Sequence, residues 1–257
     1  MSKKIVILFC TFIFATLISC EPSYRTESPS DSSRKTYTIA KARYDISLIS
    51  VERSIGTKKI SGEQRIQTVF EKGIPGFYFE DEMVRIKWSP APYDIIFVLN
   101  NKSDVPVKIV WDAARFIDEN GVSHRLIHSG TGYEDRYAPH SPTIVAARGT
   151  VEDFVHPADY FQKEEDYGGG LNKQEDYSKR SSFLPAQIKG TAEELRAKAE
   201  PFVGKTFQVI LALQSADVRN DYVSTFKING VAVTEEKSEQ EKNPDNNGKR
   251  SGRRMLF

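Results

Sequence analysis

The sequence predicts a mainly β protein, an antiparallel sandwich or barrel, and three observations support this fold class. Eleven Tyr and fifteen Phe give the chain the aromatic content that strands favour. Between residues 37 and 234, apolar residues occur in short runs or alternate with polar ones, as they do in strands. Clusters of Asn, Asp, Gly and Ser separate these runs, so we expect about eight or more short strands joined by turns.

The first clearly patterned strands lie between residues 81 and 112. Val84, Ile86 and Trp88 recur with a period of two, which places one face of a strand in a core. Residues 93–101 form a more continuous apolar run, typical of a strand that is buried on both faces or central in a sheet. A turn at 101–104 and another strand at 105–112 are expected to follow.

The later strands are predicted from the same alternation and from turn residues. Asp118–Gly121 predicts a turn, because its Asn-Gly pair tolerates positive φ. Asn229–Gly230 predicts another turn, which leads into residues 231–234. Further strands are expected at 123–128, 143–147, 150–157, 206–214 and 221–230.

One short helix interrupts this pattern. Thr191 and Glu194 fit a capping box, in which each side chain bonds the backbone of the other residue. Leu195 and Ala199 fall on one helical face, and Pro201 stops the element. We expect this helix to connect strands and to pack on one end of the sandwich.

Residues 93–127 also carry a recognisable layout. An apolar strand, a turn with Asn and Ser, a second strand and an aromatic strand lead to an acidic turn with Gly. These features fall on Phe97, Asn100–Ser103, Phe116 and Asp118–Gly121. In this respect the segment resembles bacterial extracytoplasmic domains of immunoglobulin-like shape. The resemblance implies an antiparallel immunoglobulin-like sandwich with one short connecting helix, and it implies no particular activity because one fold serves many functions.

The N-terminus has the features of an export signal. Two lysines precede an apolar stretch from Ile5 to Ile18. This stretch is about 21 Å long as a helix, whereas the hydrocarbon core of a bilayer is about 30 Å thick. A charged start and a short apolar middle are typical of a secretory signal. An uncleaved anchor helix and an ordinary secretory signal that merely ends near a cysteine are the alternatives.

The sequence Leu17-Ile18-Ser19-Cys20 follows directly and resembles the lipobox of bacterial lipoproteins. The resemblance implies that the Cys20 sulfur receives a diacylglyceryl group, that Cys20 becomes the first residue after cleavage, and that its amine is acylated, for example with palmitate. Two or three acyl chains give durable attachment to a membrane. Glu21 is not the Asp that favours inner-membrane retention in enterobacterial lipoproteins, so the outer membrane is the preferred location.

Cysteine usage, net charge and hydropathy argue against several kinds of chemistry and classes of protein. Cys10 lies in the signal, so after cleavage Cys20 would be the only cysteine, and no disulfide or thiol chemistry is expected. The net charge of +1 provides no basic field for nucleic acid. The mean hydropathy of −0.46 argues against a polytopic membrane protein.

The chain divides into four predicted parts. Residues 1–19 are the lipoprotein signal peptide, and 20–36 hold the lipidated cysteine and a flexible tether rich in Ser, Pro and charge. Residues 37–234 form the β domain, as one sandwich or as two smaller units. Residues 235–257 are expected to be a disordered, charged tail.

Motifs for catalysis or cofactors are weak, and we predict no catalytic residue, no metal ligand and no cofactor. Ser224 and Lys227 match an S-x-x-K pattern, but strand periodicity sends them to opposite faces. His124 and His128 would lie about 13 Å apart along a strand, too far to share one metal. An envelope hydrolase or a metal site built from His128, His140, His156 and loop carboxylates is kept as the alternative function.

The least ordinary segments are polar loops that contain tyrosines. Residues 133–137 and 162–182 place Tyr beside acidic and basic residues, and the second loop is unusually long. Tyrosine rings suit recognition because they provide contact area at a low entropic cost. Four tyrosines are therefore candidate partner-binding residues: Tyr133, Tyr137, Tyr167 and Tyr177.

The sequence thus predicts a lipid-anchored envelope protein that binds or assembles rather than catalyses. The expected contacts are the membrane, through the lipid, and an envelope protein or glycan, with no nucleic acid. A structural or accessory subunit of an envelope complex is a further possibility, and it predicts an exposed apolar patch.

Overall fold

The structure is a computed structural model, and it describes residues 36–55, 58–60, 65–71, 74–163 and 178–239. These residues belong to one compact unit, Lys35–Phe257. The described part of the chain is mainly β, and each of its strand pairs is antiparallel. The predicted fold class is confirmed, including its single short α-helix and its sandwich character.

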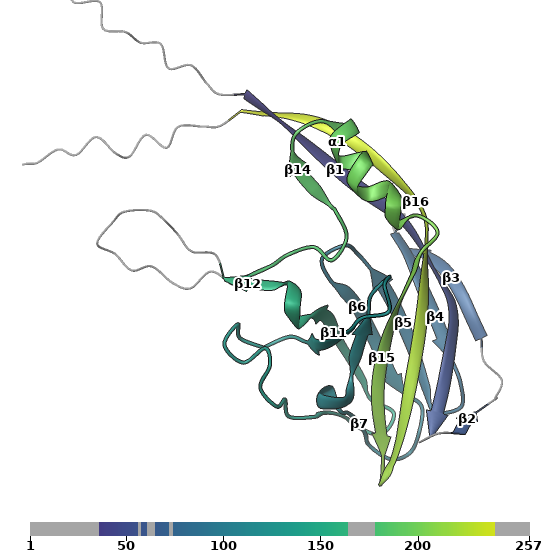
Figure 1. The fold of residues 1–257 in the computed structure, drawn as a ribbon. Coiled ribbons are helices and arrows are strands. Elements are labelled where there is room, and N and C mark those ends of the chain that lie inside the picture. Colours follow the sequence, from purple (N-terminus) through teal and green to yellow (C-terminus); the bar gives the residue numbers. More distant parts are fainter. Residues whose placement is uncertain (1–35, 56–57, 61–64, 72–73, 164–177, 240–257) are drawn as a thin grey trace, which may run out of the picture. The chain divides into compact units, whose positions relative to one another are not determined.

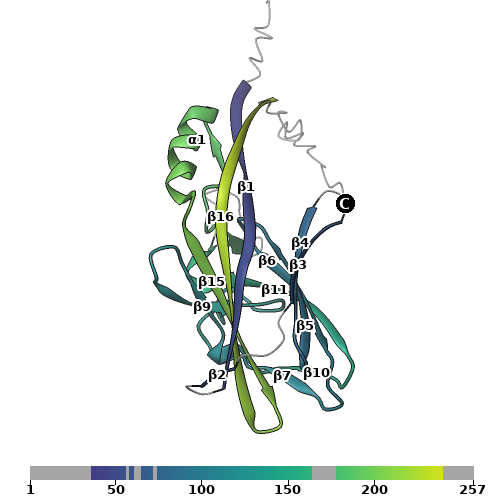
Figure 2. The same ribbon diagram turned by 90° about the vertical axis from the view of Figure 1, so that its right-hand side faces the viewer.

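The strands join into one large sheet, which curls so that its two halves face each other (Figures 1 and 2). Its first half contains, in spatial order, β14 (Gln187–Lys189), β1 (Thr36–Ile55), β16 (Val218–Glu239), β15 (Thr206–Ser215), β8 (Arg115–Ile117) and β9 (Ser123–Ile127). Its second half continues with β11 (Thr150–Pro157), β6 (Ile95–Asn101), β5 (Val84–Pro90), β4 (Ile74–Glu80) and β3 (Arg65–Glu71).

Shorter elements complete the body. The short strand β2 (Lys58–Ile60) pairs with β1, and β7 (Val107–Ile109) pairs with β15 and with β10 (Thr143–Val145). A separate hairpin is formed by β12 (Phe161–Lys163) and β13 (Ser178–Arg180). Three single turns of 3-10 helix are also present: Trp111–Ala113, Ala158–Tyr160 and Glu200–Phe202.

Aromatic side chains fill the space between the two halves of the sheet. Trp88 of β5 meets Phe226 of β16 edge to face, with ring centroids 5.8 Å apart. Phe226 stacks on Phe207 of β15 at 5.1 Å. Such pairs stabilise by about 0.5–1.5 kcal/mol beyond the burial of their area. The predicted inward face of β5, with Val84, Ile86 and Trp88, is fully buried.

The strand β6 is central in the sheet, between β5 and β11, but only one of its faces is buried. Ile95, Phe97 and Leu99 point into the core, whereas Ile96 is 44% exposed. The continuous apolar run therefore correctly predicted a strand in the middle of the sheet, but only one face of that strand is buried.

The helix α1 (Ala192–Ala199) begins with the predicted capping box, since Thr191 accepts from the Glu194 amide and Glu194 accepts from the Thr191 amide. Leu195 and Ala199 are fully buried against β1 and β16, with Ala40 of β1 also buried there. The helix lies along these strands, beside β14 (Figure 1).

The predicted turn at Asn229–Gly230 is wrong. β16 runs through these two residues, and its register with β1 shifts there, so Asn229 forms a β-bulge. Asn229 exchanges hydrogen bonds with Ser47 on β1. The Asn-Gly pair does not form a turn because β1, which is remote in sequence, pairs with β16 on both sides of it and keeps the chain extended.

The β1–β16 pair also sets where the chain enters and leaves the body. Thr36 is paired with Glu239, so the first and last described residues of the sheet are neighbours. β16 continues to Glu239, past residue 234 where we expected the domain to end.

Candidate functional site

The candidate binding surface is a stack of two tyrosines and one arginine in the loop between β9 and β10. The Arg136 guanidinium lies over the Tyr133 ring at 3.7 Å and over the Tyr137 ring at 4.8 Å. Arg136 also donates to the Tyr133 carbonyl at 2.7 Å. We call Tyr133, Arg136 and Tyr137 the platform. It presents flat aromatic area and a positive charge, and Tyr137 is 51% exposed.

Two acidic residues and a histidine hold the platform in place. The Tyr137 hydroxyl donates to Asp159 Oδ1 at 2.6 Å, and His124 Nδ1 lies 2.5 Å from Asp159 Oδ2. The other ring nitrogen of His124 lies 3.3 Å from Asp118 Oδ2. Asp159 comes from the 3-10 turn after β11 and His124 comes from β9, so a rigid part of the sheet positions an exposed loop residue.

Ionisation follows from these contacts. Burial lowers the pKa of His124, but its hydrogen bonds to the Asp159 and Asp118 carboxylates outweigh burial and raise the pKa above its ordinary value. Hydrogen bonds from Tyr137 and His124 hold the pKa of Asp159 below its usual range. With a carboxylate at each ring nitrogen, both nitrogens of His124 act as donors in the charged form. The resulting cluster is a network of charge-assisted bonds.

The platform adjoins the β12–β13 hairpin. The Tyr133 ring meets Phe161 of β12 edge to face at 5.6 Å, and Phe161 packs with Ile127 and Ala158 in a small second core. Residues 164–177 lie between β12 and β13 in the sequence. Tyr167 and Tyr177, the other two candidate tyrosines, lie in that segment, outside the described residues.

A second group of histidines is built around Trp111. The His128 ring stacks on Trp111 with centroids 4.1 Å apart, and His140 meets His128 edge to face at 5.3 Å. His128 Nδ1 is 3.5 Å from the buried Asp153 carboxylate. Burial would raise the pKa of Asp153, but contacts from His128 and backbone amides outweigh it and lower the pKa.

The structure therefore brings together two of the three histidines of the alternative site. His128 and His140 meet, whereas His156 is fully buried beside the start of β6, where its Nδ1 donates to the Tyr93 carbonyl at 2.5 Å. His124 and His128 belong to separate clusters. In the part of the chain that the structure describes, no group of three His, Cys, Asp or Glu side chains is arranged to hold a metal ion.

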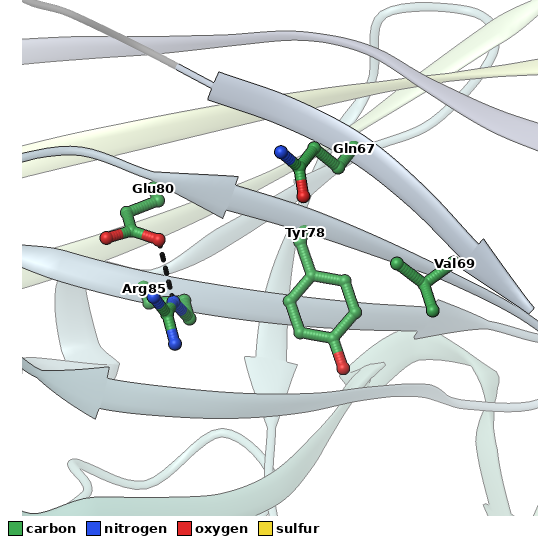
Figure 3. A pocket seen from close by; sticks show the side chains of 5 residues that line it. All are labelled: Gln67, Val69, Tyr78, Glu80 and Arg85. Carbon is green, nitrogen blue, oxygen red and sulfur yellow. Dashed lines mark hydrogen bonds and ion pairs between the residues drawn. The ribbon is translucent and has the colours of Figure 1, made fainter. Parts of the chain in front are cut away.

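A shallow hollow of about 410 Å³ lies on the outer face of the second half of the sheet (Figure 3). Side chains from three neighbouring strands line it, and Glu80 accepts from Arg85 Nε at 2.7 Å across it. Hydrogen bonds from Arg85 and Lys102 lower the pKa of Glu80 to about 2. The lining residues are Gln67, Val69, Tyr78, Glu80 and Arg85.

Sequence reasoning identified Tyr133 and Tyr137 but missed the residues that organise them. Arg136 stands between the two tyrosines in sequence, and an Arg within reach of two rings is a signal for stacking that could have been used. Asp159 is more than twenty residues away, and only the fold brings it to Tyr137.

Comparisons with known proteins add no assignment, since no family model, curated protein or solved structure matches the chain. Cys20 and the predicted signal lie outside the described residues. Among the residues that are described, no helix has the length and apolar content needed to cross a membrane.

Proposed function

We propose that the chain is a lipid-anchored lipoprotein of the bacterial cell envelope whose β body binds a partner without catalysis. The sequence Leu17-Ile18-Ser19-Cys20 supports the anchor, and the preferred location is the outer membrane. The body is proposed to be immunoglobulin-like. The predicted tether of 20–36 ends where β1 begins, so the lipid would hold the body at the end of β1 that pairs with Glu239.

The observation that carries the binding function is the pre-organised platform. Free tyrosine and arginine side chains lose conformational entropy when they bind. Here Arg136 is already stacked on two rings, and Tyr137 is already hydrogen-bonded to Asp159. These side chains are therefore ordered before a partner binds, and binding costs less conformational entropy. Tyr and Arg are also the residues that most often dominate binding energy. An envelope protein or a glycan fits this surface, since both offer groups that stack on rings and accept from a guanidinium.

Site-specific photo-crosslinking in cells tests the binding proposal. A photoreactive residue in place of Tyr137 is expected to capture one discrete partner, and Arg136→Ala in the same chain is expected to abolish the capture. Ile49 is a control of similar exposure, since it is 49% exposed and lies on β1, which pairs with β14, β16 and β2. Equal capture from positions 49 and 137, or no effect of Arg136→Ala, would contradict a binding role for the platform.

The anchor has a separate test with an internal control. Cys20→Ala is expected to abolish metabolic labelling by a fatty acid and to release the protein from membranes. Cys10→Ala, in the apolar stretch of the signal, should leave both unchanged. Labelling that survives Cys20→Ala would rule out lipidation at this residue.

One observation favours the alternative, an envelope hydrolase. A carboxylate that accepts a hydrogen bond from Nδ1 of a histidine can orient the ring so that Nε2 acts as a base, and the Asp153 carboxylate lies 3.5 Å from Nδ1 of His128. If this pair were catalytic, His128→Gln would eliminate a hydrolytic activity of the purified protein while the fold, followed by circular dichroism, is retained. Binding through the platform would not require His128.

A further inference from the structure

The strand β3 ends the second half of the sheet, and among the described residues no strand pairs with its outer edge. It has seven residues and pairs with β4 through a continuous register from Arg65↔Glu80 to Glu71↔Ile74. Residues 66–69 are exposed on both faces of the strand, with Ile66 at 39% and Val69 at 38%. The opposite end of the sheet, β14, has only three residues.

An edge of this kind invites pairing with another strand. Proteins protect open edges by shortening them, or by placing Pro, Lys or a bulge in them. The centre of β3, Ile-Gln-Thr-Val, has neither charge nor Pro, and its register is unbroken. A partner strand would bond its outward backbone groups and would cover Ile66 and Val69.

The order of residues in β3 points to its partner. The strand reads Arg-Ile-Gln-Thr-Val-Phe-Glu, and antiparallel pairing with itself about Thr68 places Arg65 opposite Glu71 at both ends. Ile66 then stands opposite Phe70, and Gln67 stands opposite Val69. Opposite charges and aromatic–aliphatic pairs stabilise antiparallel strands when they face each other.

Other arrangements of two β3 strands lose these pairs. Antiparallel pairing about Gln67 leaves Glu71 without a partner and sets Arg65 opposite Val69. Parallel pairing sets Arg65 beside Arg65, and like charges in that position destabilise. Only the arrangement about Thr68 uses the full strand and neutralises both ends.

We propose that the chain forms a two-fold symmetric dimer in which β3 pairs antiparallel with β3 of a second copy, with Thr68 on the axis. Such an interface is isologous, the commonest symmetry among homo-oligomers. It extends the sheet across both copies. Gln67 and Val69 also line the hollow with Tyr78 (Figure 3). In the proposed dimer the two hollows would therefore adjoin across the axis. This proposal does not depend on the lipid anchor or on the platform.

Cysteine crosslinking tests the register directly. A cysteine in place of Thr68 faces its own copy across the axis at a Cα separation of about 4.5–5.5 Å, which a disulfide can bridge. A cysteine in place of Ile66 is four residues from its copy along the strands, about 13 Å away, and cannot be bridged. With mild oxidation of the full chain, T68C is expected to become a disulfide-linked dimer, while I66C and the parent, which has only Cys10 and Cys20, are not.

Charge reversal tests the pairing at the ends of the strand. Arg65→Glu or Glu71→Arg alone places like charges opposite each other at two sites, and we expect the dissociation constant of the dimer to rise about tenfold or more. The double variant R65E/E71R restores both pairs and should recover the parent value. Light scattering after size-exclusion chromatography measures the mass, and circular dichroism confirms that each variant is folded.

Three outcomes would overturn the proposal. One is a parent chain that stays monomeric at every concentration reached. Another is equal crosslinking of T68C and I66C. The third is capture of a different protein at β3 by a parent that does not self-associate, because the edge would then serve another partner.

Discussion

The molecule contains two clusters of the same three residue types, one inside the sandwich and one on its surface. In the interior cluster, Arg53 lies over the Tyr222 ring at 5.6 Å, and the Tyr222 hydroxyl donates to Asp81 at 2.8 Å. In the platform, Arg136 lies over Tyr137, whose hydroxyl donates to Asp159. The two clusters differ in burial, since Tyr222 is fully buried, whereas Tyr137 is 51% exposed.

Burial gives the same chemistry two different roles. The interior cluster joins β1, β16 and the turn after β4, and Asp81 also accepts from the amides of Met83 and Val84. Burial, followed by the Asp81 charge, raises the pKa of Tyr222 far above its ordinary value, so its hydroxyl remains a donor. A buried charge must keep its partner, so this cluster fixes how the two halves of the sheet meet. The platform is exposed at Tyr137, so its ring and the neighbouring positive charge can contact a ligand.

Removal of an arginine should show the largest difference between the clusters. Arg53→Met leaves the Asp81 carboxylate buried without its counter-ion, and we expect a loss of about 3–5 kcal/mol in the free energy of unfolding. Arg136→Met removes an exposed contact and should cost less than about 1 kcal/mol. Urea unfolding followed by tryptophan fluorescence measures both. Equal losses would show that burial does not separate the two clusters.

Removal of the tyrosine hydroxyl from each cluster should give a smaller difference in stability between the clusters. Tyr222→Phe keeps the ring, which meets Phe79 at 5.9 Å, but takes one donor from Asp81. We expect a loss of about 1–3 kcal/mol, the cost of an unsatisfied buried acceptor. Tyr137→Phe should cost well under about 1 kcal/mol, because water can replace the hydroxyl at Asp159. The same urea titration applies, and a larger loss for Tyr137→Phe would contradict this interpretation.

The sequence predicted the parts of the fold that depend on local patterns. The alternation at 84–88 identified β5 and its buried face, and Thr191 with Glu194 identified the start of α1. The turn at Asp118–Gly121 is also present, with Gly121 at a φ of +81° and Asp118 Oδ1 accepting from two backbone amides. In each case the residues that decide the structure lie within a few positions of one another.

The parts that could not be predicted depend on residues far apart in the chain. Asn229–Gly230 has turn chemistry, but pairing with β1, about 180 residues earlier, makes it a bulge. The interior cluster is equally non-local, since Arg53, Asp81 and Tyr222 come from three separated strands or turns. For the platform, sequence reasoning supplied the tyrosines, and only the fold supplied Asp159 and His124.

The smallest expected effect is a dependence of the platform on pH through His124. The pKa of His124 is raised in the folded protein, so its stabilisation is full below the unfolded value of about 6.5 and is lost as pH rises through the folded value. The pKa values of Asp118 and Asp159 are lowered in the folded protein, so the stabilisation that these carboxylates contribute is present above about pH 4 and is lost in stronger acid. We therefore expect His124→Asn to destabilise by less than about 1 kcal/mol near pH 5.5 and by less still near pH 8.5.

Urea unfolding at the two pH values measures this difference between parent and variant. His140→Asn is the matched control, because His140 Nε2 faces a backbone carbonyl, that of Asp135 at 3.0 Å, rather than a carboxylate. An effect of His124→Asn that grows with rising pH would contradict the ion-pair assignment. It would show that His124 holds Asp159, and through it Tyr137, as a neutral hydrogen-bonding ring rather than as a charged one.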